Sequence, residues 1–155
     1  MFRPALFLLA FCAFATGQAQ KVSNSKLPPA IAPAFAGKFP GAKGTTWRRD
    51  GTEYEAAFKL NGKETLATYD DQGNWIRTGV QITQKELPAP VTRAVDKFYH
   101  KYKVTACAQV EVPENGTYFE VVAVKGSAIL QLYFDPEGKE LHMETEKEKD
   151  EKDND

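Results

Sequence analysis

Cysteine and histidine are scarce in this sequence of 155 residues, which holds two of each. Cys12 lies in an apolar N-terminal run, and Cys107 alone cannot form an internal disulfide in the rest of the chain. His100 and His142 form no HExxH motif, no pair four residues apart and no cluster with cysteine, so a transition-metal site lacks its ligands. We therefore expect no cofactor or metal, a buried Cys107 and two surface histidines.

Catalytic patterns are also missing from the sequence. Ser127 and Thr68 are not part of a GxSxG nucleophile motif. Asp70, Asp71 and Asp135 lack the alternating acids and the final glutamate of a calcium-binding loop, and Asp and Gly are common turn formers. The sequence therefore predicts a protein that is not an enzyme.

Charge of one sign does not dominate, because the formal net charge is −1. Residues 20–143 contain 16 basic and 14 acidic residues, a balance that argues against nucleic-acid binding. Residues 144–155 contain seven acids, three lysines and no apolar side chain. We expect this segment to be a disordered acidic tail.

Long hydrophobic runs are absent after residue 20. Ala5–Ala15 is apolar over 11 residues, well short of the roughly 20 that a membrane-spanning helix needs. Arg3 before this run and the small residues Gly17 and Ala19 after it are typical of a secretory signal peptide, residues 1–19. Cleavage is expected after Ala19, or else after Gly17. The sequence thus predicts an exported protein without stable membrane insertion after signal cleavage.

The rest of the chain carries clear helix, strand and turn signals. Residues 20–26 are predicted to be a polar linker, and a proline-led amphipathic helix is predicted from Leu27 to Phe39. Four strands are predicted to follow at 42–49, 52–60, 63–69 and 74–83. They are separated by Asp50-Gly51, by Asn61-Gly62 and by residues 70–73, all typical turn sequences.

The same order of signals recurs about sixty residues later. Leu87-Pro88-Ala89-Pro90-Val91 matches Leu27-Pro28-Pro29-Ala30-Ile31 at an offset of 60, and residues 134–138 match residues 69–73 at an offset of 65. The pattern predicts an α+β fold of two tandem units, 27–83 and 84–143, each a helix followed by four antiparallel strands. A unit of about 60 residues is marginal alone. We therefore expect the two units to share one sheet or to pack together.

The alternation of apolar residues suggests which side chains face the helices. Trp47, Tyr54 and Phe58 are predicted to lie in the core. The later strands are apolar on both faces, so their open side either packs internally or forms a binding face. The residues predicted for this open, binding side are Tyr69, Trp75, Arg77, Phe119, Val121, Ile129 and Tyr133.

Several segments together resemble a known family. The segments LPPAIAPAFAGKFPGAKGTTW, YEAAFKLNG, YDDQGNW, LPAPV, YFEVVAVKG and FDPEG are similar to the beta-lactamase-inhibitor-like, PepSY-like domain of bacterial periplasmic proteins. The resemblance covers Leu27 to Met143. Cys107 stands where the first unit has Trp47, and the acidic tail lies outside the pattern.

The resemblance implies a secreted or periplasmic bacterial protein, and a non-enzymatic module that binds or inhibits another protein or a peptide. We expect the open sheet face to make that contact. The alternative is a carrier that holds a small apolar ligand between the sheet and the helices.

Overall fold

The computed structural model describes residues 20–114 and 116–147. The predicted signal peptide, residues 1–19, and the last part of the predicted tail, residues 148–155, lie outside the described residues.

The fold is α+β, as predicted, with one antiparallel sheet whose nine strands follow one another in sequence order. A helix precedes four strands in each half: α1 (Ile31–Lys38) comes before β2 and α2 (Ala89–Tyr99) before β6. Short 3-10 helices, η1 (Asn24–Lys26) and η2 (Gln84–Glu86), lie just before α1 and α2. The strands are β1 (Gln20–Val22), β2 (Lys43–Asp50), β3 (Glu53–Leu60), β4 (Lys63–Tyr69), β5 (Trp75–Ile82), β6 (Lys103–Val112), β7 (Gly116–Lys125), β8 (Ala128–Phe134) and β9 (Glu140–Lys147).

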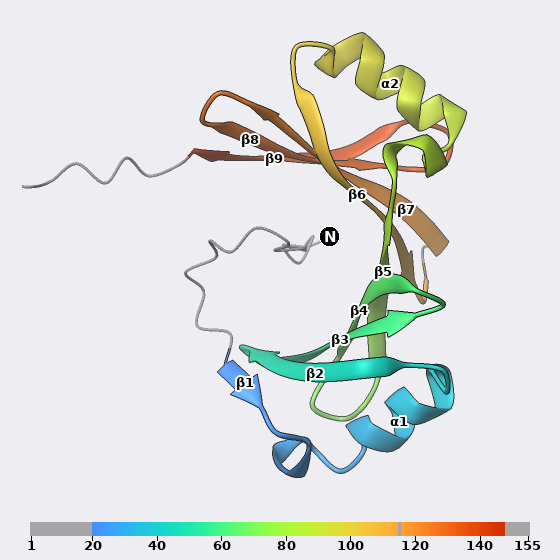
Figure 1. The fold of residues 1–155 in the computed structure, drawn as a ribbon, viewed down its shortest axis with the longest axis vertical. Coiled ribbons are helices and arrows are strands. Elements are labelled where there is room, and N and C mark those ends of the chain that lie inside the picture. Colours follow the sequence, from blue (N-terminus) through green and yellow to red (C-terminus); the bar gives the residue numbers. More distant parts are fainter. Residues whose placement is uncertain (1–19, 115, 148–155) are drawn as a thin grey trace, which may run out of the picture.

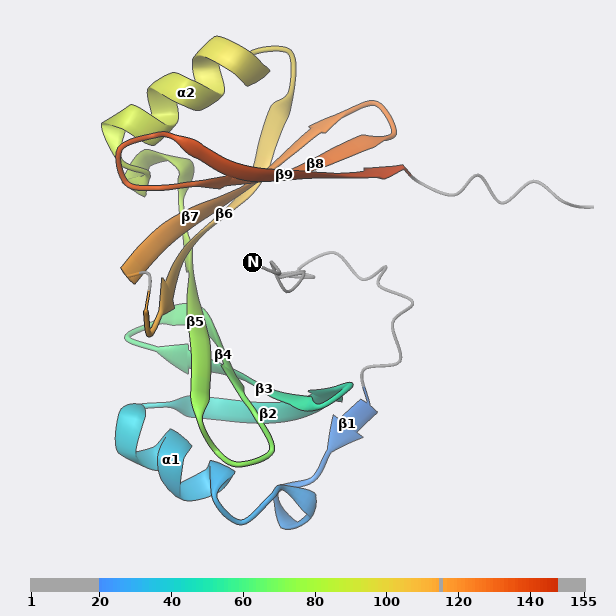
Figure 2. The same ribbon diagram turned by 180° about the vertical axis from the view of Figure 1, so that it is seen from behind.

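The chain continues its sheet from one half into the other at β5 and β6, which pair directly through Gly79 and Val110. All nine strands therefore form one sheet. Figures 1 and 2 show that this sheet bends strongly and that α1 and α2, the two α-helices of residues 20–114 and 116–147, both lie on its outer side.

Two expected boundaries are wrong. Residues 20–22 are not linker but strand β1, which pairs with β2 through Val22 and Trp47. Residues 144–147 belong to β9 and not to a disordered tail. Their backbone pairs with β8 up to the end of the strand, where Lys147 lies opposite Ala128. An edge strand can thus be polar and still ordered, because its backbone bonds are made by the neighbouring strand.

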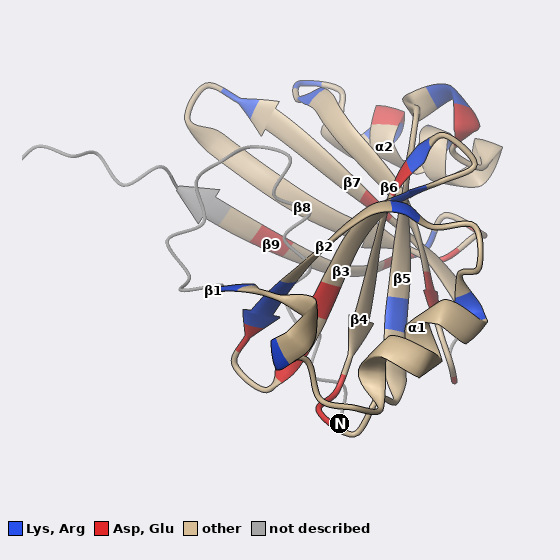
Figure 3. Ribbon diagram, turned by 60° about the horizontal axis from the view of Figure 1, so that its bottom comes forward, with Lys and Arg blue, Asp and Glu red and all other residues tan. Residues whose placement is uncertain are grey.

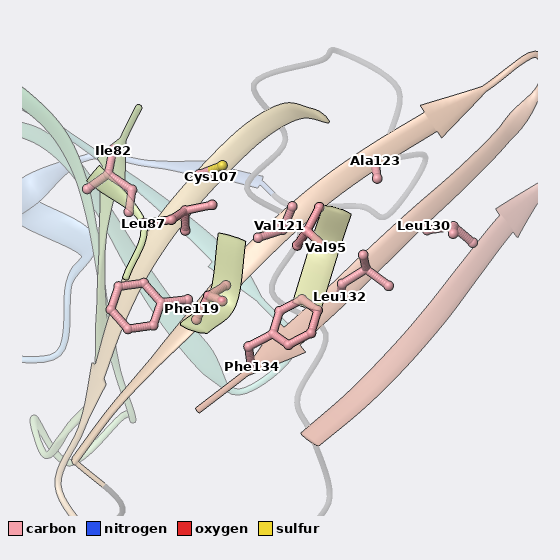
Figure 4. Close-up of a cluster of buried hydrophobic side chains, with 11 residues drawn as sticks. Ile82, Leu87, Val95, Cys107, Phe119, Val121, Ala123, Leu130, Leu132 and Phe134 are labelled. Atoms are coloured by element: carbon pink, nitrogen blue, oxygen red, sulfur yellow. The ribbon is translucent and has the colours of Figure 1, made fainter. Parts of the chain in front are cut away.

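Two hydrophobic cores separate the helices from the sheet. The first lies under α1 and includes Ile31, Trp47, Tyr54 and Phe58, so the core prediction for these three aromatics is confirmed. The second lies under α2, and Figure 4 shows its side chains, Cys107 among them, gathered from β5–β8 and the helix. Each helix is thus held by apolar burial on the outer side of the sheet.

The loop from β4 to β5 and the loop from β8 to β9 are built in the same way. The Asp70 carboxylate accepts a hydrogen bond from the backbone N–H of Asn74 at 2.8 Å. The Asp135 carboxylate accepts one from the backbone N–H of Lys139, also at 2.8 Å. These aspartates close turns, which agrees with the turn interpretation of their sequences.

A glycine in each of these loops lies against the start of the preceding helix. A Cβ atom on Gly73 would lie 2.8 Å from the Cβ of Ala30, and one on Gly138 would lie 2.5 Å from the carbonyl oxygen of Pro90. Both glycines have positive φ, +84° and +82°. Glycine alone satisfies both conditions, so these loops fix each helix to the end of its four strands.

Candidate functional site: the concave face

The concave face is the inner side of the bent sheet, opposite the helices. Side chains alternate between the two sides of a strand, so the members of this face are the neighbours of the core residues on each strand. They include Glu55, Thr68, Arg77, Ala108, Val110, Tyr118, Glu120, Val122, Ile129, Gln131, Tyr133, His142 and Glu144.

Arg77 on β5 lies near the middle of the concave face. Its side chain is largely buried, and its Nη2 lies 3.3 Å from Oε2 of Glu53 on β3. Burial raises the pKa of the nearby Glu55, and the positive charge of Arg77 opposes that rise. Figure 3 shows basic segments on β2 and β5 and an acidic segment on β3.

Glu120 on β7 is the most unusual group of the concave face. It is 2% exposed. Neither of its carboxylate oxygens has a hydrogen-bond partner among the described residues. Burial raises its pKa to about 8, Arg77 opposes the rise, and Glu144 adds to it. A carboxyl group in this setting is largely protonated at neutral pH, because burial disfavours the charged form.

Aromatic rings surround Glu120 toward the β9 edge. The Tyr133 hydroxyl donates a hydrogen bond to Oε1 of Gln131 at 3.1 Å. The Tyr133 ring lies 6.1 Å from that of Tyr118 and 5.9 Å from that of His142, measured between ring centres. Burial, with a smaller contribution from Glu120, raises the pKa of Tyr118 to about 12, so this phenol stays protonated.

His142 has a carboxylate partner on its own strand. Its Nε2 lies 3.3 Å from Oε1 of Glu144. Both histidines of the sequence, His100 and His142, are exposed, as predicted. His100 is the C-cap residue that follows α2, and His142 lies on β9.

Three of the seven predicted binding residues lie on the concave face: Arg77, Ile129 and Tyr133. The face assignment is wrong for the other four. Tyr69 and Trp75 pack with the first core, and Phe119 and Val121 with the second.

Tyr69 is in the core because of the register of the β3–β4 hairpin. The two-residue turn Asn61-Gly62 pairs Leu60 with Lys63, and this register places Tyr69 directly opposite Tyr54. Residues opposite one another share a face. The Asn-Gly turn was recognised in the sequence, so its register could have placed Tyr69 beside Tyr54.

Trp75 is in the first core because of a β-bulge. Thr68 pairs with Arg77 and Tyr69 pairs with Trp75, which leaves Ile76 as an extra residue. The bulge shifts the alternation, so Trp75 and Thr78 point to the same side, and the indole Nε1–H donates to Oγ1 of Thr78 at 2.8 Å. Strict alternation along β5 predicted the opposite side for Trp75.

Phe119 and Val121 share the helix side with Phe134 and Leu132, with which they pair. The same register places Glu120 opposite Tyr133. Phe119 and Val121 therefore cannot lie on the same side as Tyr133.

Glu120, Tyr118 and Gln131 were missed by the sequence analysis. A signal for them exists, because Lys125 pairs with Ala128 across a two-residue turn at Gly126-Ser127. This hairpin register puts Glu120 on the side of Tyr133. The burial of a glutamate in a predicted open face could not be read from the sequence, since it depends on the bend of the sheet.

Other predicted features have clear places in the structure. Cys107 is buried, as predicted, and burial raises its pKa to about 11, so its thiol is a poor nucleophile. Across residues 20–114 and 116–147, no three His, Cys, Asp or Glu side chains are grouped to hold a metal ion. None of the helices in this part of the chain has the length and apolar character to span a membrane.

The described surface has one depression beside α2 and another on the inner side of the sheet, where Ala57 and Lys59 alternate with the core residue Phe58 on β3. One, of about 360 Å³, lies between α2 and the β8–β9 loop and is lined by Ala94, Phe98, Tyr99, Phe134, Gly138 and Glu140. The other, of about 260 Å³, lies beside residues 43–46 of β2. Both include exposed residues in their lining.

Comparisons with known proteins identify relatives of the chain. A family model described as "Putative beta-lactamase-inhibitor-like, PepSY-like" matches residues 15–68 and 52–142. A BLIP-like protein of Bacteroides fragilis is 28% identical, with a TM-score of 0.70 over 79% of this chain and 88% of its own.

Two further solved structures share the fold. A DUF2874 family protein of Bacteroides uniformis is 24% identical, with a TM-score of 0.73 over 76% of this chain and 88% of its own. A "putative periplasmic" protein of Bacteroides eggerthii has the same identity, 24%, and TM-score, 0.73, over 77% and 88%. No curated protein matches the chain.

Proposed function

The chain belongs to the beta-lactamase-inhibitor-like, PepSY-like family, and we propose that it is a periplasmic or secreted, non-enzymatic module that binds another protein or an extended peptide through its concave face. The observation that carries this proposal is the position of both helices on the outer side of the sheet, which leaves the inner side without a helical cover (Figure 1).

The chemistry of the concave face supports a protein partner. Tyr118, which is partly exposed, is of a residue type enriched at protein interfaces and among their energetic hot spots. Tyr133 and Arg77 are of such types too, but they are only 6% and 5% exposed in the free chain. Ile129 adds apolar surface that is partly exposed. The BLIP-like relative, whose name refers to inhibition, supports the same class of function.

We also propose that the chain is a tandem duplication with units at 27–83 and 84–143. Its support is the match between the two loops closed by Asp70 and Asp135 and between the two glycines, Gly73 and Gly138, packed on helix starts. Export is a further part of the proposal. It rests on the signal-like residues 1–19 and on the relative from Bacteroides eggerthii.

Site-specific photo-crosslinking in the native periplasm tests the binding face. A photoreactive amino acid at Ile129 or Tyr118 should give a discrete adduct with a partner, because these side chains are on the concave face. The matched controls are Ala32 and Ala36, which are exposed on α1. Adducts at the two control positions in equal yield would refute the concave face as the binding surface.

A second measurement uses the partner recovered in this way. Tyr118→Ala should raise the dissociation constant by roughly tenfold or more, as expected for an aromatic anchor. Gln109→Ala, on the helix side of β6, should leave it unchanged. Unaltered affinity of a folded Tyr118→Ala variant would argue against the proposed contact.

The carrier alternative has no structural observation in its favour. It requires an enclosed apolar chamber between sheet and helix. The two depressions described above are lined in part by exposed residues, and the one near α2 has the exposed Phe98 and Glu140 at its margin.

A further inference from the structure

The β9 edge has a long outer backbone edge, exposed apolar side chains and charged segments near it, and the proposed binding at the concave face explains none of these. β9 is the last strand of the sheet and has eight residues, and among the described strands only β8 lies beside it. The opposite edge strand, β1, has only three residues. The outer backbone groups of β9 are therefore available over a length of about 27 Å, at roughly 3.4 Å per residue.

The large hydrophobic side chains that the described structure exposes lie at this edge. Phe98 is 64% exposed, Leu141 52% and Met143 44%. Phe98 lines the depression of about 360 Å³ between α2 and the β8–β9 loop, and Tyr99 bridges the depression to β9 by donating a hydrogen bond to Glu140 at 2.6 Å. A long, exposed edge with apolar side chains is a pairing site for another strand.

The first half of the chain shows how the corresponding edge is used. β5 holds the place of β9 in that half, and its outer edge pairs with β6. Where the second half has Phe98, the first half has Lys38, sixty residues earlier, and its ammonium covers the ring of Trp75 at 3.5 Å. The apolar surface is thus covered in the first half and exposed in the second.

Charge indicates which partner suits the β9 edge. Residues 148–155, which follow β9 directly, contain five acids and two lysines, a net charge of −3. The stretch from α2 to the start of β6, residues 89–103, contains Arg93, Lys97, Lys101 and Lys103 against Asp96, a net charge of +3. The chain therefore carries two segments of opposite charge, residues 89–103 and residues 148–155.

We propose that β9 pairs antiparallel with β9 of a second copy of this chain, so that the acidic residues after Lys147 of each copy lie against the basic α2 region of the other. In an antiparallel pair centred on Met143, Lys147 at the end of β9 in one copy comes near the β8–β9 loop of the second. The acidic residues that follow Lys147 thus begin close to the depression lined by Phe98.

Within one copy, Lys147 lies at the end of β9 opposite the β8–β9 loop and the depression beside α2. In the paired arrangement His142 of each copy faces Glu144 of the other. Because the contact is confined to one strand edge and to exposed charges, we expect a weak, reversible dimer with a dissociation constant on the order of tens of micromolar.

Analytical ultracentrifugation of the chain without residues 1–19 tests the proposal. The expected result is a monomer–dimer equilibrium between roughly 5 μM and 1 mM. Met143→Lys should abolish the dimer, whereas Gln109→Lys, at an exposed position of the interior strand β6, should leave it intact. Thermal unfolding at low concentration shows that both variants are folded.

A variant that ends at Lys147 separates two contributions to the stability of the dimer, the electrostatic attraction of residues 148–155 and the pairing of the two β9 strands. Its dimer should be weaker by about tenfold, since several exposed ion pairs are lost together. Lys97→Glu with Lys101→Glu should weaken the full-length dimer similarly, and replacing the acids of residues 148–155 by lysines should restore it.

Three results would overturn the proposal. They are a monomer throughout the concentration range, a dimer insensitive to Met143→Lys, and species that grow beyond the dimer, which would indicate head-to-tail pairing. None of them bears on the concave face, so the proposed function and this interface fail independently.

Discussion

The ammonium group of Lys38 lies 3.5 Å from the ring centre of Trp75, so the last residue of α1 covers an indole on β5. The Trp75 Nε1–H also donates a hydrogen bond to Oγ1 of Thr78, and this bond fixes the indole on the helix side of the sheet. A cation above a tryptophan ring contributes about 0.5–1 kcal/mol at an exposed site.

Lys38→Met keeps most of the apolar stem and removes the charge. We expect the free energy of unfolding to fall by about 0.5–1 kcal/mol in urea titrations followed by tryptophan fluorescence. Lys26→Met, on the 3-10 helix η1, is the control and should have little effect. Equal stability of the two variants would show that the cation–π contact contributes nothing measurable.

The two loop glycines should be far more sensitive to substitution than glycines at hairpin tips. Gly126 also has positive φ, +58°, but nothing lies within 4 Å of a Cβ placed there. Gly126→Ala should therefore cost only the conformational strain, about 1–2 kcal/mol. Gly138→Ala adds a clash with the backbone of Pro90 and should cost at least twice as much, as should Gly73→Ala in the first half.

Chemical denaturation of the three variants measures these differences. If Gly138→Ala and Gly126→Ala were equally stable, the loop would be able to move away from α2 at little cost. The anchoring role of these glycines would then be wrong.

Much of the fold could be predicted because its signals are local. The Asn61-Gly62 turn fixes β3 and β4, and the bounds of β4 agree with the predicted strand at 63–69. Trp47 and Phe58 followed from simple alternation. Turn chemistry and apolar periodicity act within a few residues, so the sequence shows them directly.

The candidate site was harder to predict because its features depend on register and curvature. Trp75 changes sides through one extra residue at Ile76, and a one-residue shift exchanges the two faces of a strand. Glu120 is buried because the whole sheet bends around it. No local pattern near Glu120 reports that bend.

Glu86 should stabilise the protein at neutral pH and lose this effect in acid. Its carboxylate accepts hydrogen bonds from Lys63 at 2.6 Å and from the backbone N–H of Thr83 at 2.8 Å. The Lys63 hydrogen bond, then those from Thr83, lower the pKa of Glu86 from 4.5 to about 2. A lowered pKa in the folded state gives stability above the unfolded pKa, and this stability is lost as the pH falls toward 2.

Glu86→Gln tests this assignment through the pH dependence of unfolding. The variant should be less stable than the natural protein at pH 7, and the difference should shrink as the pH falls below about 4.5. Glu137→Gln, in the β8–β9 loop, is the control. A difference that stays constant down to pH 2 would show that the hydrogen bonds of Glu86 do not depend on its charge.

Glu120 should stabilise the protein in acid and lose this effect as the pH rises, because burial raises its pKa to about 8. Between the unfolded pKa, 4.5, and about 8 the folded protein binds a proton that the unfolded chain has released. Its contribution to stability is therefore complete below pH 4.5 and is lost as the pH rises toward 8. Glu120→Gln removes this dependence, since the amide keeps the shape of the protonated acid without an ionisation.

Urea titrations from pH 4 to pH 9 measure the effect. The stability of the natural protein relative to Glu120→Gln should fall by roughly 1 kcal/mol per pH unit between pH 5 and pH 8 and level off above it. Glu111→Gln, exposed on β6, should show no such trend against the natural protein. Parallel curves for Glu120→Gln and the natural protein would mean that Glu120 is ionised in the folded state. Arg77 or solvent would then stabilise its charge, and the polar centre of the concave face would present a carboxylate to a partner rather than a neutral acid.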